Sequence, residues 1–299
     1  MAPRPDLRGT SDTEAMLDVR LPHLPDDWAV WAVSDVHGVT SGLVTALQQA
    51  GLIVAESHWV APPRTALVGC GDYLDRGGDI DGLVALLQRL QAEAAAAGGA
   101  VVLARGNHEL MPMMARAGAH EWVETWLAYG GRETVAAYGC GVPDAGRPGE
   151  LLRALDTCAP RLFDWTETLV QAVRWRDVLF VHGGLAPGHS LEDLGVTTDE
   201  HLWVRSGFFD TPWDADVFES YRVAGIGRVV FGHTPQWAGP TFYHEGRSLG
   251  IDTNAVGNPR MPEGAVQELT LLGLGDSDTF DDARLIRVPT ADAPDRMNR

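Results

Sequence analysis

Residues 65–77 read TALVGCGDYLDRG, a mainly apolar run that gives way abruptly to glycine and two aspartates. This change predicts a short buried strand over residues 65–68 that enters a polar loop. Residues 83–97 then favour a long helix, because their leucines recur at helical spacing and Gly98-Gly99 follows them. The order of strand, polar loop and helix is typical of a βαβ unit.

The same order recurs along the chain. Residues 28–33 and 101–104 each predict a strand that stops at a polar loop, and residues 40–51 predict a helix. Further strands are expected over 170–175 and 178–181 as a hairpin, over 228–231, around 242–251, and over 266–272. This rhythm predicts an α/β fold with a largely parallel sheet.

Residues 111–168 break the rhythm with a helical pattern. Trp122 and Trp126 fall at helical spacing among other apolar residues, which favours ordinary packing over an aromatic binding box. We therefore expect a helical insertion that covers the sheet.

Five polar clusters follow five of the predicted strands. The carboxyl ends of strands in an α/β sheet face one crevice, so these side chains are expected to converge there. Their glycines let the backbone approach closely or adopt positive φ. The clusters are Asp35-Val36-His37-Gly38, Gly71-Asp72-Tyr73-Leu74-Asp75-Arg76-Gly77, Gly106-Asn107-His108-Glu109, His182-Gly183-Gly184 and Gly232-His233-Thr234.

The residue types in these clusters indicate a metal site. One such cluster alone is more often a turn with an incidental histidine, whereas five together are strong joint evidence. Carboxylate, imidazole and amide ligands suit divalent manganese, iron or zinc better than a soft, thiophilic ion. No serine or cysteine stands in a nucleophile-elbow setting, which is consistent with hydrolysis without a covalent intermediate.

The order and the residue sequences of these clusters resemble the motifs of the calcineurin-like metallophosphoesterases. Within that family they are similar to the phosphoprotein-phosphatase branch with its GDxxDRG and GNHE signatures, including Shewanella-like protein phosphatases and bis(nucleosyl)-tetraphosphatases. The resemblance spans Asp35 to about Asp252. It implies a sandwich of two mixed β-sheets flanked by helices, with the helical insertion between the third and fourth motifs.

The resemblance also implies two divalent metal ions held by six side chains. The pair in the first motif binds one ion, the first aspartate of the second motif bridges both ions, and the remaining three ligands bind the second ion. In that order the implied ligands are Asp35 and His37; Asp72; and Asn107, His182 and His233. A bridging carboxylate holds two ions about 3.5 to 4 Å apart, where they can share a hydroxide. Manganese is the first expectation, with iron and zinc as alternatives.

Four further residues are expected to handle the substrate. The resemblance implies that His108 is the general acid and that Asp75 orients it, although His108 could instead be a structural histidine. Arg76 resembles the arginine that forks onto the phosphate. Arg205, in a Leu-Trp-x-Arg stretch, is expected to be a second phosphate contact, with a surface salt bridge as the alternative.

Two positions depart from family patterns. Many relatives outside this branch end in GHxH, but Pro235 stands in the place of the second histidine. The first metal then keeps three protein ligands and an open position, as a catalytic site requires. Ile251-Asp252-Thr253 resembles the strand that follows GHT in bacterial members, although Asn254 stands where they usually carry glycine.

Composition narrows the function classes. The 299 residues carry 23 Lys+Arg against 41 Asp+Glu, a net charge of −18, which is the wrong sign for a nucleic-acid track or an anionic membrane surface. No stretch approaches the length of a membrane span. Cys70, Cys140 and Cys158 are an odd number without CxxC spacing, so no disulfide framework is expected and a reducing compartment fits best. A cytoplasmic location is therefore expected.

We expect a flexible leader over residues 1–27, one catalytic domain over 28–275 with a helical lid at about 111–168, and a partly frayed tail over 276–299. The leading hypothesis is a dinuclear-metal hydrolase of phosphate monoesters, a phosphoprotein phosphatase that uses a metal-bridging hydroxide. The alternatives are a hydrolase of dinucleoside polyphosphates and, from another class, a non-catalytic scaffold stabilised by metal. The ligands cannot separate the first two, because the surface around the metals selects the substrate.

Overall fold

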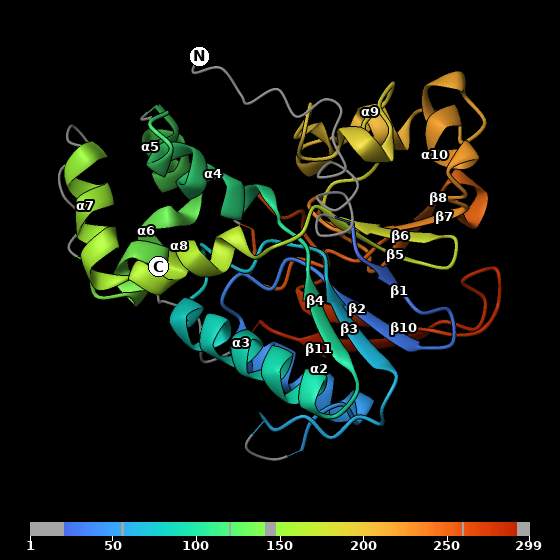
Figure 1. Ribbon diagram of the computed structural model, residues 1–299, viewed down its shortest axis with the longest axis horizontal. Coiled ribbons are helices and arrows are strands. Elements are labelled where there is room, and N and C mark those ends of the chain that lie inside the picture. The colour runs from blue at the N-terminus through green and yellow to red at the C-terminus, as the bar shows by residue number, and fades with distance from the viewer. Residues whose placement is uncertain (1–20, 55–56, 120, 141–147, 259, 292–299) are drawn as a thin grey trace, which may run out of the picture.

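The computed structural model describes residues 21–54, 57–119, 121–140, 148–258 and 260–291. In this part of the chain two mixed β-sheets pack against each other, with helices on their outer faces (Figure 1). The strand orders are β11-β10-β2-β3-β4 in the five-stranded sheet and β1-β5-β6-β7-β9-β8 in the six-stranded sheet. This architecture confirms the expected sandwich.

The five-stranded sheet has a parallel half and an antiparallel half. Its strands are β2 (Ala29–Val33), β3 (Thr65–Gly69), β4 (Ala100–Leu103), β10 (Glu268–Leu274) and β11 (Arg284–Pro289). Strands β2, β3 and β4 run parallel, and β10 pairs antiparallel with both β2 and β11. The register pairs Val33 with Gly69 and Gly69 with Leu103, so the three parallel strands end side by side.

The six-stranded sheet is built around three parallel strands. Its strands are β1 (His23–Leu24), β5 (Ala172–Trp175), β6 (Val178–Val181), β7 (Arg228–Phe231), β8 (Thr241–Tyr243) and β9 (Ser248–Gly250). Strands β5 and β6 form the expected antiparallel hairpin, and β6, β7 and β9 run parallel. Val181 pairs with Phe231, which pairs with Gly250, so these strands also end level with one another.

Successive side chains of the strands point to opposite faces, so the apolar side chains form three core layers: one between the sheets and one on the outer face of each sheet. Val178 and Phe180 of β6 point between the sheets, while Leu179 and Val181 point to the opposite face. Successive side chains of a strand lie on opposite faces, so a strand covered on both faces reads as a continuous apolar run. This is why the strands were visible as short hydrophobic stretches.

The helices differ in length between the two outer faces. The five-stranded sheet is covered by two long helices, α2 (Thr40–Ala50) and α3 (Ile80–Ala96) (Figure 1). Helix α2 buries Leu43 and Leu47 and ends where Gly51 adopts φ 74°, the left-handed conformation that glycine tolerates. The six-stranded sheet is covered by short elements: η3 (Leu191–Asp193), η4 (Glu200–Leu202), α9 (Ser206–Phe209), η5 (Asp216–Phe218), α10 (Glu219–Val223) and η6 (His244–Gly246).

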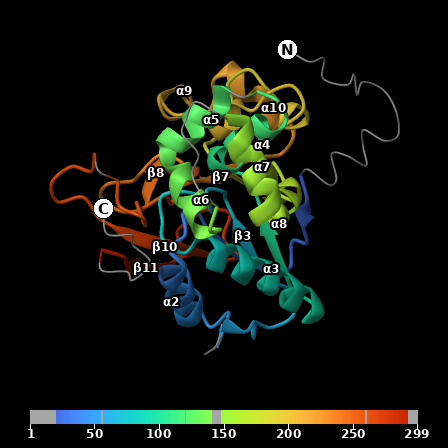
Figure 2. The same ribbon diagram turned by 90° about the vertical axis from the view of Figure 1, so that its left-hand side faces the viewer.

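The expected helical insertion lies between β4 and β5. It contains α4 (Asn107–Arg116), α5 (Glu121–Trp126), the turn η2 (Leu127–Gly131) with a kink at Gly130, α6 (Arg132–Ala137), α7 (Pro148–Cys158) and α8 (Pro160–Glu167). These helices gather at one end of the molecule (Figures 1 and 2). The insertion begins four residues before the expected start, because Asn107 and His108 already belong to α4.

Both chain ends differ from expectation where the structure describes them. Residues 276–299 were expected to be a frayed tail, but residues 284–289 form β11 and bury Ile286 and Val288 against the core. His23 and Leu24 of the expected leader pair with β5 as β1. Residues 1–20 and 292–299 lie outside the described residues. No helix in the described part of the chain is long and apolar enough to cross a membrane.

The cysteine prediction was wrong in one respect. Cys140, after α6, and Cys158, at the end of α7, form a disulfide with a Cα–Cα distance of 6.0 Å, while Cys70 is free and buried. An odd number of cysteines does not reveal which two the insertion brings together. Because this disulfide is present, the cysteines no longer support the expectation of a reducing compartment.

Candidate active site

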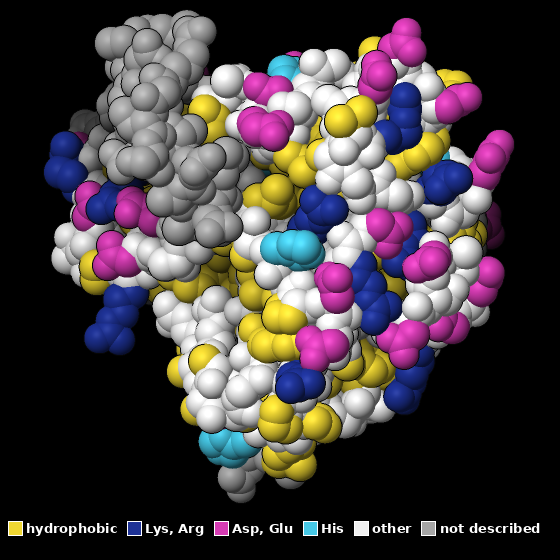
Figure 3. Space-filling view, turned by 45° about the vertical axis from the view of Figure 1, so that its right-hand side comes forward, with side chains coloured by type: hydrophobic (Ala, Val, Ile, Leu, Met, Phe, Trp, Pro, Cys, Tyr) yellow, Lys and Arg dark blue, Asp and Glu magenta, His cyan; other side chains and the backbone are white. Residues whose placement is uncertain are grey.

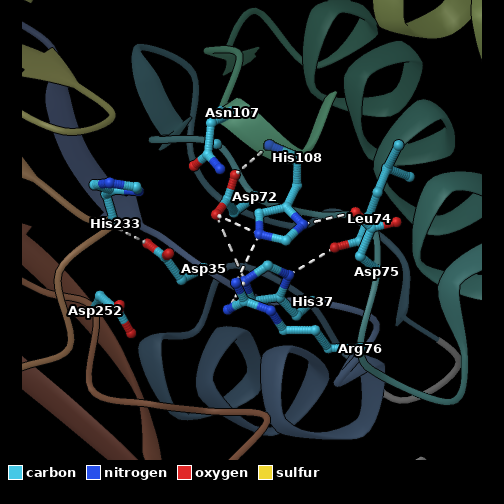
Figure 4. Close-up of polar contacts among 12 residues, drawn as sticks. Asp35, His37, Asp72, Leu74, Asp75, Arg76, Asn107, His108, His233 and Asp252 are labelled. Atoms are coloured by element: carbon cyan, nitrogen blue, oxygen red, sulfur yellow. Dashed lines mark hydrogen bonds and ion pairs between the residues drawn. The ribbon is translucent and has the colours of Figure 1, made fainter. Parts of the chain in front are cut away.

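The five polar clusters meet where the parallel strands of both sheets end. Asp35 follows β2, Asp72 follows β3 and Asn107 follows β4, all from the five-stranded sheet. His182 follows β6 and His233 follows β7 on the other sheet. Figure 4 shows Asp35, Asp72, Asn107 and His233 facing a common centre. The level ends of the strands explain how residues up to about two hundred positions apart come together.

Two groups of potential metal ligands share Asp72. In the first, ligand atoms of His37, Asp72 and His108 lie within 4.8 Å of one another. In the second, the same limit holds for Asp72, His182 and His233. The residues of both triads are buried.

The two oxygens of Asp72 face different triads. Its Oδ2 lies 3.5 Å from Nε2 of His37 and 3.8 Å from Nε2 of His108. Its Oδ1 lies 3.3 Å from Nε2 of His182. Burial raises the pKa of Asp72, but the neighbouring His182, His108 and His37 outweigh burial and hold it well below its ordinary value. An ionised carboxylate with one oxygen toward each triad is the geometry that a bridge between two cations requires.

The backbone orients two of the histidines for ligation. Nδ1 of His37 lies 2.6 Å from the carbonyl oxygen of Leu74, and Nδ1 of His182 lies 2.8 Å from that of Cys70. Since a carbonyl only accepts, each Nδ1 carries a proton, and Nε2 is the ring nitrogen that faces the site. Burial lowers the pKa of His37 well below its ordinary value, which favours its neutral form.

Asn107 lies beside the second triad. Its Oδ1 is 2.9 Å from Nε2 of His182, so the amide oxygen and the imidazole point toward the same position. The ring of His182 packs edge to face on that of His233, with centroids 5.0 Å apart. The predicted ligands of the second ion are therefore neighbours in space.

Asp35 is placed differently from the other predicted ligands. Its Oδ2 accepts hydrogen bonds from the hydroxyl of Ser34 and from the backbone N–H of His233, at 2.9 Å from the latter nitrogen. It belongs to neither triad of the described residues. Burial, followed by the carboxylates of Asp252 and Asp72, raises the pKa of Asp35 well above its ordinary value. A cation in this acidic group would relieve that penalty.

His108 and Asp75 form a buried pair. Nδ1 of His108 lies 2.6 Å from Oδ2 of Asp75, and the two side chains are 1% and 0% exposed. Burial raises the pKa of Asp75 to about 8, against the effect of hydrogen bonds from Thr134 and Trp126. The close contact leaves Nε2 of His108 facing the centre of the site (Figure 4).

Arg76 brings a guanidinium to the first triad. Its Nη1 donates to Nε2 of His37 at 3.0 Å, and its Nη2 donates to Nε2 of His108 at 2.7 Å. A fixed positive charge with several N–H donors therefore lies where an anion would approach.

Arg205 reaches the site from the six-stranded sheet side. Its Nη1 donates to Oγ1 of Thr234 at 2.9 Å, next to His233. Asp35, Asp252 and Asp72 are its electrostatic neighbours, although burial, the largest influence, lowers its pKa. The described structure places Arg205 beside the metal motifs and shows no surface salt bridge for it.

Backbone strain is concentrated in the motifs. Left-handed φ values are uncommon outside glycine and cluster at functional sites. Six of the predicted site residues adopt them: Asp35, His37, Asp72, Asp75, Arg76 and His233, with φ from 44° to 71°. The strain redirects each side chain toward the centre immediately after its strand.

Sequence reasoning gave no role to four residues that shape the site. Glu109 is fully buried and accepts hydrogen bonds from the backbone N–H groups of Asp72, Tyr73, Leu74 and Gly106. It thereby holds the second motif against the third.

The other three are Asp252, Trp126 and Thr134. Asp252 follows β9, is buried, and has a pKa that burial raises to about 6. Its position after a parallel strand was the signal that could have identified it. Trp126 and Thr134 of the insertion both bond Asp75, and no local sequence signal reveals that contact.

A family model described as calcineurin-like phosphoesterase matches residues 29–250, which is most of the chain and includes strands β2 to β9. The chain belongs to the calcineurin-like phosphoesterase family. This membership confirms the resemblance found in the motifs and the prediction of a metal-dependent phosphoesterase.

Individual relatives of this phosphoesterase agree with the family. Shewanella-like protein phosphatase 2 of Arabidopsis thaliana is 28% identical over 277 residues, covering 74% of this chain and 70% of the relative. The structure of a cold-active protein-tyrosine phosphatase of a psychrophilic Shewanella species covers 91% of this chain and 84% of its own, with a TM-score of 0.54 at 20% identity. A protein serine/threonine phosphatase from Saccharomyces cerevisiae covers 95% and 89%, with a TM-score of 0.58 at 17% identity. At these identities the two structures show the shared fold.

Proposed function

We propose that this phosphoesterase is a dinuclear-metal phosphatase that hydrolyses phosphate monoesters on phosphorylated proteins. The observation that carries the proposal is the pair of buried triads that share Asp72, with one carboxylate oxygen toward each. A structural metal site has no need of a shared carboxylate beside an arginine and a buried His-Asp pair.

The donor set fits two divalent cations. Asp35, His37 and Asp72 would hold one ion, and Asp72 with Asn107, His182 and His233 would hold the other. The ring orientations of His37 and His182 support this assignment, because the backbone carbonyls at Nδ1 leave Nε2 facing the site. Two such ions, when bound, polarise a phosphoryl oxygen and make water a nucleophile at neutral pH. Manganese is our first choice, with iron or zinc as alternatives.

The arginines would hold the phosphoryl group. Arg76 carries two N–H groups toward the centre of the site, a fork that matches two phosphoryl oxygens. Arg205, anchored on Thr234, supplies a second positive charge from the other sheet. Both roles suit an otherwise acidic molecule, whose charge of −18 gives a phosphate no general attraction.

His108 would act on the leaving group. Nε2 of His108 accepts from Arg76 in this structure. Once it is protonated and Arg76 binds the phosphoryl group instead, Nε2 would give its proton to the ester oxygen as the bond to phosphorus breaks, while Nδ1–H donates to Asp75. The alcohol side chain leaves neutral, and water supplies the new oxygen on phosphorus.

The metal ligands suit both substrate classes, so the relatives decide our choice of protein phosphomonoesters over dinucleoside polyphosphates. Shewanella-like protein phosphatase 2, at 28% identity, supports protein phosphomonoesters as the substrate class. The outer face in Figure 3 shows acidic and basic side chains interspersed, without a continuous basic stripe outside the grey atoms.

A substrate panel tests the proposal. Manganese-supplemented protein is assayed on an aryl phosphate, on Ser/Thr and Tyr phosphopeptides and on a dinucleoside tetraphosphate, with Asp72→Asn as the inactive reference. We expect phosphopeptide turnover that chelation abolishes. Preference for the tetraphosphate by orders of magnitude supports the polyphosphate alternative, and no metal-dependent turnover of any substrate contradicts the proposal. A cytoplasmic location stays a prediction that fractionation of the source cells tests.

A further inference from the structure

The helical insertion reaches the buried pair through two side chains. Trp126, the last residue of α5, directs its indole N–H between both carboxylate oxygens of Asp75, at 2.9 and 3.1 Å. Thr134, in α6, donates its hydroxyl hydrogen to Oδ1 of Asp75 at 2.5 Å. The same hydroxyl accepts the backbone N–H of Asp75 at 3.0 Å.

These contacts fix the orientation of the carboxylate. An ionised carboxylate offers about four lone-pair positions on its two oxygens. Trp126 and Thr134 hold Oδ1, and Oδ2 faces Nδ1 of His108 at 2.6 Å. Asp75, Trp126 and Thr134 are each 0% exposed, so water does not compete for these positions.

The kinked turn between Trp126 and Thr134 contacts Arg76, the residue after Asp75 in the second motif. The carbonyl of Gly130 accepts the backbone N–H of Arg76 at 3.2 Å, and the carbonyl of Tyr129 accepts its Nε–H at 3.4 Å. Gly130 has φ 112°, and a Cβ atom there would lie 2.9 Å from the backbone nitrogen of Arg76. The kink at Gly130 therefore lets this turn approach the backbone of Arg76 closely.

We propose that Trp126 and Thr134 are positioning residues, through which the insertion fixes Asp75 and thereby aims His108 at the leaving group. The inference rests on the proposed function, because it requires His108 to give a proton to the departing oxygen. By this proposal the insertion does more than pack against the sheet, because it also positions a residue that takes part in the chemical step.

The proposal predicts a dependence on the leaving group. Proton donation by a positioned side chain contributes roughly 10² to 10⁴ in rate and matters most when the departing oxygen is strongly basic. An alkyl phosphate such as a phosphoserine peptide needs that proton, whereas 2,4-dinitrophenyl phosphate releases a weakly basic phenolate without it. A wrongly oriented His108 should therefore slow hydrolysis of the phosphoserine peptide and leave hydrolysis of 2,4-dinitrophenyl phosphate nearly unchanged.

The test compares kcat and KM of the metal-loaded enzyme on these two substrates. The test variants are Thr134→Val and Trp126→Phe, with His108→Asn as the reference for lost proton donation. Matched controls within the insertion are Thr166→Val and Trp165→Phe. Thr166 is equally buried but bonds the carbonyl of Phe163, and the buried indole nitrogen of Trp165 has no hydrogen-bond partner in the described structure.

We expect Thr134→Val and Trp126→Phe to lower kcat on the phosphoserine peptide about 10-fold or more, with less than about 2-fold change on the activated ester and little change in KM. Thr134→Ser should recover most of the loss, because it keeps the hydroxyl. The controls should match the wild type on both substrates. Thermal melting shows whether a variant has lost its fold or only the orientation of His108. If Thr134→Val does not fold, the comparison uses Thr134→Ser and Trp126→Phe instead.

Equal losses on both substrates, or equal losses in the controls, overturn the positioning role while leaving the proposed function intact. A His108→Asn enzyme without leaving-group dependence removes the proton-donor role on which the inference rests. A wild-type enzyme inactive on both esters contradicts the proposed function itself.

Discussion

Oδ1 of Asp72 lies 3.3 Å from Nε2 of His182, while Oδ2 of the same carboxylate lies 3.5 Å from Nε2 of His37. One buried side chain therefore connects motifs that come from two different sheets. The five-stranded sheet supplies all the predicted ligands of the first ion, whereas those of the second ion come from both sheets, so the packing of the sandwich completes the candidate site.

Asp72→Asn should weaken metal binding at both positions. The substitution keeps the size of the side chain but removes the charge shared by the two triads. Loss of an outer partner of a ligand typically costs 10- to 100-fold in metal affinity, so loss of the shared ligand should cost at least about 100-fold. Calorimetric titration with Mn²⁺ measures the change. Asp26→Asn, at an exposed carboxylate, is the control, and unchanged affinity in Asp72→Asn contradicts the bridging role.

His108→Asn should lower kcat by about 10² to 10⁴ without changing the metal content. The geometry makes this a sharp test, because Nε2 of His108 lies in the first triad, 3.8 Å from Asp72. Elemental analysis of the metal-saturated variant accompanies the kinetics. A variant that holds one ion fewer than the wild type identifies His108 as a ligand and contradicts its assignment as the acid.

Arg76→Ala should weaken the binding of inorganic phosphate as a competitive inhibitor. Charge-assisted hydrogen bonds contribute about 1.5–3 kcal/mol, which corresponds to roughly 10- to 150-fold in the inhibition constant. Arg89→Ala, on the exposed face of α3, should leave the constant unchanged. Phosphate inhibition that is the same in both variants removes Arg76 from the phosphate site.

Glu109→Gln should destabilise the fold. The carboxylate accepts four backbone N–H groups at 2.8 to 3.0 Å, and the amide nitrogen of glutamine cannot accept any of them. Unsatisfied buried donors cost about 1–3 kcal/mol each, so we expect a loss of roughly 2–5 kcal/mol in the free energy of unfolding. Urea denaturation measures it. Glu93→Gln, which loses a partly exposed contact with Trp59, should lower the free energy of unfolding by about 1 kcal/mol or less. Equal losses in the two variants would contradict the role of Glu109 in holding the second motif against the third.

The disulfide between Cys140 and Cys158 should stabilise the insertion. It closes a loop with a sequence separation of 18, and a loop of that size contributes roughly 3 kcal/mol in the chain-entropy account. Urea denaturation with and without reductant measures the difference. In the unfolded, unreduced protein Cys70 alone should react with a thiol reagent, and labelling of all three cysteines shows that the bond is absent.

The strand-end motifs could be predicted because their signals are local. Each of Asp35, Asp72, Asn107, His182 and His233 comes within four residues of the end of an apolar run, so the rule that strand ends converge was sufficient to bring them together. The same rule applies to Asp252 after β9, but β9 has only three residues and gives a weak apolar signal.

The remaining features depend on tertiary packing. The contacts of Trp126 and Thr134 with Asp75 join residues 51 and 59 positions apart, and helical spacing shows only that Trp126 faces a core. The strand β11 carries two arginines in six residues, so its pattern resembles a polar tail until pairing with β10 buries its apolar face. The cysteine pairing likewise follows from where the insertion places α6 and α7.

The number of cations that the protein holds tests the central claim most directly. Wild-type protein is titrated with Mn²⁺ at equilibrium, and the bound ions are counted and followed by electron paramagnetic resonance. We predict saturation at two ions per chain, with the spectrum of a magnetically coupled pair because Asp72 is shared between them. Saturation at a single ion, or two ions without coupling, contradicts the account.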